Sequence, residues 1–223
     1  MNAQPDAREF EYWTPEPIFR GATVFCLASG PSLTPEIATR IRGHRTIVVN
    51  SSCGLAPWAD VLYFTDSSWY EERRDLVAAW SGLVVSMSRT AKRELPDKVR
   101  RIEGLGDPSG MIPGYFPVPG SSVVRQGRTS GHTAIALAIA CGASRVVLVG
   151  YDMRVVAGRE HHHAEYSGPR DLDQYARDFV PAFRGWHADA LAVGAEIVNA
   201  TPGSAVAEFP FVSLEWALAC AAS

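Results

Sequence analysis

Short apolar runs separated by polar or helix-forming stretches dominate the chain after residue 22. Six of these runs are rich in β-branched or aromatic residues and lie at 23–28, 46–50, 61–64, 83–86, 145–149 and 196–199. They are continuous rather than alternating, which is typical of strands covered on both faces in a parallel sheet. The pattern therefore predicts six buried strands.

Helix-forming segments separate the predicted strands. Thr34 and Pro35 are residue types that favour an N-cap and a first helical position. Further helices are expected over 67–80, 132–141, 171–193 (kinked at Pro181) and 214–221. Strands alternating with helices in this way predict an α/β, Rossmann-like fold with a mostly parallel sheet and helices on both faces.

Two stretches depart from this alternation. Residues 1–22, with three prolines among charged and aromatic residues, are expected to form an N-terminal arm. Residues 89–124 hold five prolines and several glycines, which predicts an irregular insertion or lid. The length from 23 to 223 suits a single domain that contains this insertion.

Composition excludes several classes of protein. Hydrophobic residues make up 47% and charged residues 20%, and the net charge of −3 does not indicate a polycation. No run of about 18 apolar residues predicts a membrane span, and the first 16 residues lack the apolar centre of a signal peptide. The four cysteines are scattered, which favours reduced thiols over a zinc site or disulfides. We expect a cytoplasmic protein with no membrane partner.

The first predicted strand is followed by Ser29, Gly30, Pro31 and Ser32. Ligands in such sheets bind outside the carboxyl ends of the strands. Glycine lets a ligand approach the backbone, serine offers a hydroxyl, and the next helix N-terminus favours an anion such as phosphate. An ordinary tight turn would use the same residues. The sequence has neither a G-x-G-x-x-G run nor a P-loop, which argues against ordinary NAD binding and Walker-type ATP hydrolysis.

Polar residues also follow other strands. Asn50 and Asp66 come after the second and third predicted strands, and Tyr151 and Asp152 follow the strand at 145–149. Two carboxylates at neighbouring strand ends could hold Mg²⁺ together with substrate phosphates, so Asp66 and Asp152 are candidate metal ligands. Asp66 could equally cap the helix after it, and both carboxylates could bond to backbone.

Two further clusters have side chains suited to phosphate binding or proton transfer. Thr129, Ser130 and Gly131 begin a helix and follow Arg128, so they could bind a phosphate or simply cap the helix. His161 and His163 lie in the polar loop after Asp152 and would point the same way in an extended segment. Either histidine could act as a general base or a metal ligand, or occupy an unspecialised loop.

A basic stretch overlaps the proline-rich segment. It comprises Arg89, Lys92, Arg93, Lys98, Arg100 and Arg101. The simplest interpretation is a solvated face, and a surface for a polyanionic acceptor such as DNA is the alternative.

The runs Ala28–Leu33, Thr129–Gly131 and Val146–Asp152 together resemble two related families. One is the bacterial sialyltransferases that use a CMP-activated sugar, and the other is the archaeal 6-hydroxymethylpterin diphosphokinases, which transfer pyrophosphate from ATP with magnesium. The chain is also similar to uncharacterised proteins of tailed phages and prophages, on Pro57–Asp60, Asp66, the Gly-Tyr-Asp-Met run at 150–153 and the pair His161 and His163. The resemblance covers about residues 23 to 215.

The resemblance implies roles for individual residues. Gly30, Ser32, Ser130 and Gly131 would bind the nucleotide part of a donor, and Asn50 would lie against it. A histidine after the Asp152 strand would activate an acceptor hydroxyl. Tyr166 and Tyr175 are candidates for the tyrosine pair that steadies the departing phosphate. Aspartate at position 66, where the sialyltransferases have asparagine, is closer to the magnesium-using pattern.

These observations predict a nucleotide-dependent transferase, most simply a glycosyltransferase with a histidine base. A magnesium- and ATP-dependent pyrophosphoryl transferase and a non-catalytic nucleotide-binding phage protein are the alternatives. The expected cofactor is a nucleotide or nucleotide-sugar donor, with Mg²⁺ as a candidate. The acceptor could be a glycan, a small molecule or modified DNA, and the sequence leaves a homo-oligomer open.

Overall fold

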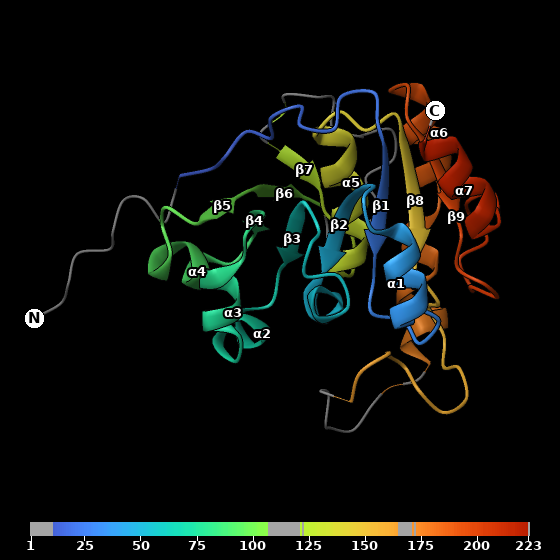
Figure 1. Ribbon diagram of the computed structural model, residues 1–223, viewed down its shortest axis with the longest axis horizontal. Helices are drawn as coiled ribbons and strands as arrows, with labels where there is room; N and C mark the ends of the chain where they lie inside the picture. Colours follow the sequence, from blue (N-terminus) through green and yellow to red (C-terminus); the bar gives the residue numbers. More distant parts are fainter. Residues whose placement is uncertain (1–10, 107–120, 122, 165–170, 172, 223) are drawn as a thin grey trace, which may run out of the picture.

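The computed structural model describes residues 11–106, 121, 123–164, 171 and 173–222. Seven strands form one parallel sheet in the order β5-β4-β3-β2-β1-β8-β9, which runs through the middle of the molecule (Figure 1). They are β1 (Thr23–Leu27), β2 (Arg45–Val49), β3 (Val61–Phe64), β4 (Leu83–Ser86), β5 (Val99–Arg101), β8 (Arg145–Val149) and β9 (Glu196–Asn199). The prediction of an α/β, Rossmann-like fold with a parallel sheet is confirmed.

Helices cover both faces of the sheet, as predicted. The buried residues of α5 (Ser130–Ala140) and α6 (Trp186–Ala192) belong to the hydrophobic cluster on one face. The second cluster, on the other face, is built with α1 (Pro35–Ile41), α2 (Ser67–Glu71), α3 (Arg74–Ala79), α4 (Arg89–Glu94) and α7 (Leu214–Ala221). Thr34 caps α1 by accepting a hydrogen bond from the Ile37 amide at 3.3 Å.

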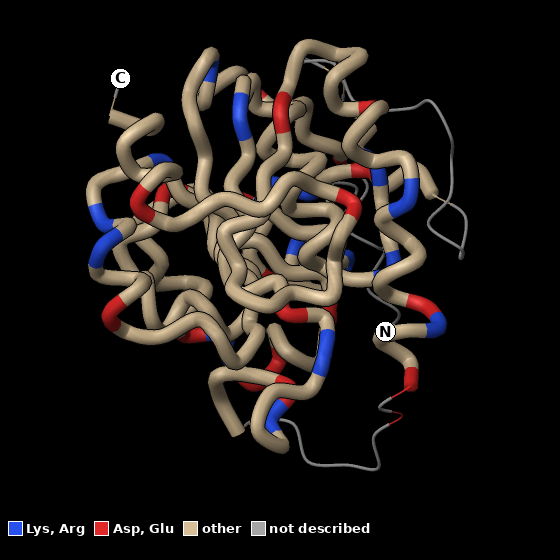
Figure 2. The backbone as a smooth tube through the Cα atoms, turned by 90° about the vertical axis from the view of Figure 1, so that its right-hand side faces the viewer, with Lys and Arg blue, Asp and Glu red and all other residues tan. Residues whose placement is uncertain are grey.

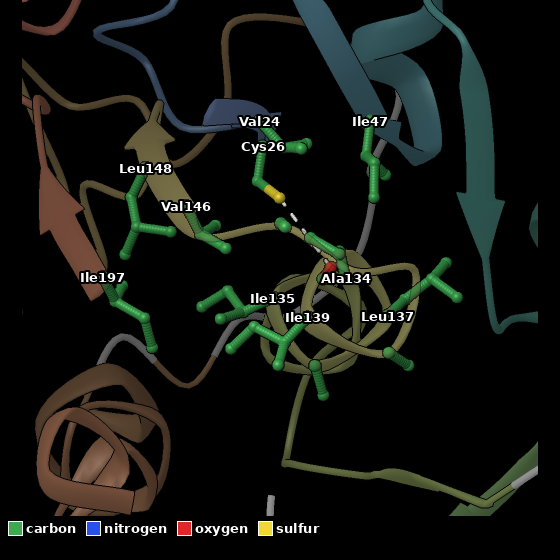
Figure 3. Close-up of a cluster of buried hydrophobic side chains, with 14 of the residues drawn as sticks. Val24, Cys26, Ile47, Ala134, Ile135, Leu137, Ile139, Val146, Leu148 and Ile197 are labelled. Atoms are coloured by element: carbon green, nitrogen blue, oxygen red, sulfur yellow. Dashed lines mark hydrogen bonds between the residues drawn. The ribbon is translucent and has the colours of Figure 1, made fainter. Parts of the chain in front are cut away.

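The α5 helix is the centre of the first cluster. All ten residues from Gly131 to Ala140 are buried, because the sheet covers one side of the helix and Phe19, Phe183 and Trp186 cover others. Figure 3 shows Ile135 and Ile139 of α5 beside Val146, Leu148 and Ile197 of β8 and β9. A helix that is apolar all round requires this burial.

The described part of the predicted arm packs on the domain. The Trp13 amide donates to the Arg101 carbonyl at 2.6 Å, which occupies part of the exposed edge of β5. The Phe19 amide donates to the Cys141 carbonyl at 2.9 Å, and the Phe19 side chain is buried. Covering a sheet edge limits pairing with other chains. Residues 1–10 lie outside the described part.

Two helix predictions were wrong in extent. The helix expected over 67–80 is divided into α2 and α3. The long helix expected over 171–193 is replaced, within the described residues, by a π-helical turn (Tyr175–Phe179), a 3₁₀ turn (Pro181–Phe183) and α6. Pro181 cannot donate the backbone hydrogen bond that a continuous helix needs at that position.

The irregular insertion expected over 89–124 was wrong in its described part. Residues 89–94 form α4, and β5 is the edge strand of the main sheet. A separate parallel pair joins β6 (Glu103–Leu105) to β7 (Val123–Arg125). These strands have three residues each, which is too short for a recognisable pattern. Residues 107–120 and 122 lie outside the described part.

The basic stretch at 89–101 does not present all its cations to solvent. Lys92 Nζ donates to the Pro96 carbonyl at 2.6 Å, and Lys98 Nζ donates to the Trp80 carbonyl. The Arg101 guanidinium lies 4.5 Å from the centre of the Tyr12 ring and is largely buried. Three of the six cations are therefore engaged within the protein, which weakens the interpretation of this stretch as an exposed face that binds a polyanion.

In the view of Figure 2, positions with Lys or Arg and positions with Asp or Glu are interspersed along the backbone. Among the helices of the described residues, none has the length and apolar character needed to cross a membrane.

Candidate functional site

The order of the strands places a crevice between β1 and β8. From β1 the chain adds β2, β3, β4 and β5 on one side, and after α5 it adds β8 and β9 on the other. Ligands of open parallel sheets bind at such a reversal, outside the carboxyl ends of the strands. A cavity lies there, lined by residues that follow β1, β2 and β8, by the start of α5, and by the segments at 160–161 and 175–179.

The cavity brings together most of the residues expected to bind a nucleotide. Its lining includes Ser29, Gly30, Asn50, Thr129, Ser130, Gly131 and one of the two candidate bases, His161. Pro31, Ser32, Asp66, Arg128, Tyr151, Asp152 and His163 do not line it. The cavity therefore gathers one part of the predicted site residues, and the others lie at the same edge of the sheet outside its lining.

The turn after β1 is crowded at Gly30. A Cβ atom at this position would collide with the Asp152 carboxylate and the Gly150 carbonyl. The Gly30 amide donates to that carbonyl at 2.9 Å, which ties the turn to the end of β8. Glycine is therefore required here by the close approach of two strand ends, and the same approach forms one wall of the cavity.

Asp152 is buried and supports the turn rather than the cavity. Its Oδ2 accepts hydrogen bonds from the Ser32 hydroxyl at 2.8 Å and from the Ser32 amide at 3.3 Å. These bonds use the serine groups that were expected to bind phosphate. Asp152 thus positions Ser32 in the turn, and the catalytic role expected for Asp152 and the ligand-binding role expected for Ser32 stay predictions.

The shared magnesium site on Asp66 and Asp152 does not fit the topology. Asp66 follows β3 and Asp152 follows β8, and β2 and β1 lie between them. Three interstrand steps amount to roughly 14 Å, whereas Mg²⁺ binds oxygen at about 2.1 Å. The strand ends are not neighbours, so that expectation was wrong. Among the described residues, no group of three or more His, Cys, Asp or Glu is placed to hold a metal ion.

Asp66 occupies the N-cap position of α2, but its side chain makes no capping hydrogen bond. The residue is solvent-exposed, and partial loss of hydration around its carboxylate raises its pKa above the usual value. It offers no contact to the cavity.

The N-terminus of α5 opens into the cavity. Ser130 and Gly131 are its first two residues, and the side chain of the N-cap residue Thr129 does not bond to their amides. The Tyr151 hydroxyl donates to the Gly131 carbonyl at 2.9 Å from a fully buried ring. Tyr151 thus holds the helix start in place, and Arg128 is exposed outside the cavity.

The histidine loop lies against the turn after β1. The His162 amide donates to the Ser29 carbonyl at 3.0 Å. The rings of His161 and His163 are stacked, with centroids 5.2 Å apart and planes 6° apart. The His162 and His163 rings are also in contact, with centroids 4.9 Å apart, so alternation along the loop does not set His162 apart from the other two. Of the three histidines, His161 lines the cavity.

Two residues of the cavity have left-handed backbone conformations. Asn50 has φ of 50° and Met153 has φ of 49°. Asparagine tolerates this region, whereas methionine rarely adopts it. Such strain persists only where the surrounding structure imposes it, and it concentrates at functional sites.

Sequence reasoning missed several lining residues. Val49, Met153, Glu160 and Phe179 line the cavity, as does Tyr175, which was considered only as a phosphate-steadying tyrosine. Phe179 and Tyr175 come from the π-helical turn, and their ring centroids are 5.6 Å apart. A π turn at 175–179 has no distinctive sequence pattern, although it is a feature often found at functional sites. Tyr166 lies outside the described residues.

A wider hollow lies at the opposite edge of the sheet, around the amino ends of β1, β2 and β8. Two of its arginines are paired, Arg45 with Asp60 at 3.0 Å and Arg145 with Glu196 at 2.6 Å. We place the functional site at the carboxyl edge, where the strand order reverses, the backbone is strained and the α5 N-terminus is exposed.

The fold is that of a Rossmann-like α/β protein, and its cavity at the topological reversal of the sheet is a candidate ligand site. No protein-family model matches the chain. No curated protein matches it in sequence either. The family resemblance therefore stays a prediction, and the function must be argued from the geometry of the cavity.

The positioning role of Asp152 predicts that Asp152→Asn is tolerated. The asparagine oxygen can still accept both bonds from Ser32, so the free energy of unfolding should change by less than about 1 kcal/mol. Asp152→Ala leaves the Ser32 donors without their partner and should cost about 1–3 kcal/mol. Urea denaturation of the two variants provides the measurement. If Asp152→Asn lost all turnover while its stability and ligand affinity stayed unchanged, the carboxylate would have a chemical role.

His132 on α5 predicts an acid-dependent loss of stability. Burial lowers its pKa to about 3, the neighbouring Phe179 carbonyl opposes that shift, and the Arg125 charge adds to it. The unfolded chain binds a proton at this histidine below pH 6.5, whereas the native protein does not until about pH 3. Stability should therefore fall by about 1.4 kcal/mol per pH unit as the pH decreases through this window.

The measurement is urea denaturation at several pH values between 6.5 and 4.5. His132→Asn should reduce the slope by about one proton relative to the unsubstituted protein. Equal slopes for the His132 variant and the unsubstituted protein would show that His132 is protonated in the native state.

Proposed function

We propose that this protein is a nucleotide-dependent transferase, most simply a glycosyltransferase, whose donor binds in the cavity at the reversal of the sheet. The observation that carries the proposal is the start of α5. Its first two residues line the cavity at the place where α/β folds of this kind bind nucleotides, and no side chain caps their amides.

The α5 N-terminus supplies the phosphate contact in this proposal. The amides of Ser130 and Gly131 stand at the positive end of a helix of 11 residues. Helix dipole and free N–H groups together favour an anion, so a donor phosphate can bind there without a lysine or arginine.

The opposite wall suits the uncharged parts of a nucleotide. Tyr175 and Phe179 provide aromatic rings, and Val49 and Met153 add apolar surface. Aromatic faces stack on nucleobases irrespective of their identity. The Asn50 Oδ1 atom is buried without a hydrogen-bond partner, so it can accept a bond from the donor.

His161 is the proposed general base. Its imidazole takes the proton of an acceptor hydroxyl while the acceptor oxygen forms a bond to the anomeric carbon of the donor sugar. The bond from that carbon to the phosphate oxygen breaks, and the electron pair leaves with the nucleotide. The α5 amides stabilise the charge that develops on the departing phosphate. General-base assistance contributes typically about 10²–10⁴ in rate.

The pyrophosphoryl-transferase alternative has less support than before. It rested on two carboxylates holding Mg²⁺ together with ATP phosphates, and Asp66 and Asp152 are three strand positions apart. A nucleotide-binding protein without turnover would share the same cavity, and measurement of turnover distinguishes it from an enzyme.

Nucleotide binding is tested by thermal shift with CMP, UDP, GDP and ATP, each with and without Mg²⁺. A nucleotide at about 100 times its dissociation constant should add about 2.7 kcal/mol to stability. We expect CMP, UDP or GDP to stabilise the protein without metal. Stabilisation by ATP, and only in the presence of Mg²⁺, would favour the pyrophosphoryl transferase. If no nucleotide stabilised the protein, both the glycosyltransferase and the pyrophosphoryl transferase would be contradicted.

Two variants of one residue locate the phosphate in the same assay. Ser130→Pro removes the amide donor at the first helical position, where proline is well accepted, and the extended Thr129 before it is compatible with proline. We expect at least a roughly tenfold loss of nucleotide affinity. Ser130→Ala keeps the amide and should retain most of the affinity. A Ser130→Pro variant that is folded and binds normally would contradict the α5 contact.

The base is tested with two histidine variants. His161→Ala should lower turnover by about 10² or more while nucleotide affinity stays close to normal, because the histidine acts on the acceptor. His163→Ala removes only the ring stacked on His161 and should have a smaller effect. Turnover is measured by release of the nucleotide from the nucleotide sugar. Loss of nucleotide affinity in His161→Ala would instead identify a donor contact.

A further inference from the structure

Ser130 lines the cavity, and the proton of its hydroxyl is used in a hydrogen bond within the protein. Ser130 Oγ donates a hydrogen bond to Thr65 Oγ1 at 3.1 Å. The Tyr63 hydroxyl, from a fully buried ring on β3, bonds to the same Thr65 oxygen at 3.1 Å and fixes its position. A hydroxyl has only one proton. Toward a ligand, Ser130 Oγ therefore presents lone pairs.

The Thr129 hydroxyl is held by His132. Its oxygen lies 2.8 Å from His132 Nδ1, and the direction of this hydrogen bond depends on the tautomer of the imidazole. The bond fixes the place of the Thr129 hydroxyl, so the acceptor character of the lining is argued from the other side chains.

Other side chains of the lining also offer hydrogen-bond acceptors. Asn50 Oδ1 is a buried acceptor without a partner. Glu160 contributes a carboxylate. None of the described residues that line this cavity is Lys or Arg, and only His161 can become cationic there. Among the described lining residues, Ser130, Asn50 and Glu160 thus offer acceptor oxygens, and the N–H donors at the start of α5 are taken by the phosphate in the proposed function.

We infer that the group held beside the phosphate is a neutral, hydroxyl-rich sugar and not an acidic sugar with a carboxylate. This inference rests on the proposed function. Sugar hydroxyls can donate to Ser130 and Asn50. A carboxylate has no proton to donate, so it would meet these lone pairs with repulsion, and the described lining residues include no Lys or Arg to compensate for its lost hydration.

The test uses matched glycosides that need no nucleotide. Methyl glycosides of gluco, galacto and manno configuration are each compared with the uronate that has a carboxylate in place of the C6 hydroxymethyl group. Binding is followed by saturation-transfer NMR on the full chain. We expect at least one neutral glycoside to bind about tenfold more tightly than its uronate. Equal or tighter binding of the uronates, or no binding of any glycoside, would overturn the inference.

The source of the selectivity is tested at Thr65. Thr65→Val keeps the shape but removes the acceptor, so the Ser130 proton becomes available to the ligand. The preference for the neutral glycoside should then fall several-fold, whereas Thr65→Ser keeps the acceptor and the preference. An unchanged preference in a folded Thr65→Val variant would overturn the assignment of the Ser130 proton. Ser130→Ala gives a second reading, because it should weaken the neutral glycoside without improving its uronate.

The two proposals fail in different ways. Glycoside binding without any nucleotide binding would remove the transferase and leave a neutral-sugar site. Nucleotide binding together with a preference for uronates would keep the transferase and remove the inference about the sugar.

Discussion

The burial of α5 from Gly131 to Ala140 is the constraint on which the site depends. Ten consecutive residues of this helix are inaccessible to solvent, so the helix can only lie across the sheet under further cover from the N-terminal segment and α6. A helix fixed in this way has a fixed N-terminus, and this one ends at the carboxyl edge of the sheet. The packing of apolar side chains therefore determines where two polar amides and two hydroxyls are presented.

A second constraint acts at the strand ends themselves. Gly30 and Gly150 let the turns after β1 and β8 approach so closely that a side chain at Gly30 would strike the Asp152 carboxylate. Asp152 in turn holds Ser32, and the His162 amide holds the Ser29 carbonyl. Some polar residues at this edge hold the walls of the crevice in place, and others line it. Asp152 is buried because it belongs to the first group, whereas Ser130 belongs to the second and is accessible to a ligand.

Much of the edge could be predicted from the sequence, but the roles of its residues could not. Continuous apolar runs identified six of the seven main strands, the strand-end rule located Gly30 and Asn50, and the pattern of a helix start located Ser130. The shared metal site failed because chain order does not reveal strand order, and β1 and β2 lie between Asp66 and Asp152. The aromatic residues Tyr175 and Phe179 were not expected to lie together at the cavity, because the sequence pattern at 171–193 predicts one long helix. The structure has a π turn at 175–179 and a 3₁₀ turn that begins at Pro181.

The sequence by itself determined the fold class, since the period and continuity of its apolar residues require strands buried on both faces. It also determined α5, because a helix without a polar face has to be internal. Only the tertiary structure decided which polar groups share the cavity and which way their protons point. Those choices follow from contacts far apart in the chain, such as Ser130 with Thr65 and Ser32 with Asp152, and local residue patterns contain no information about such pairings.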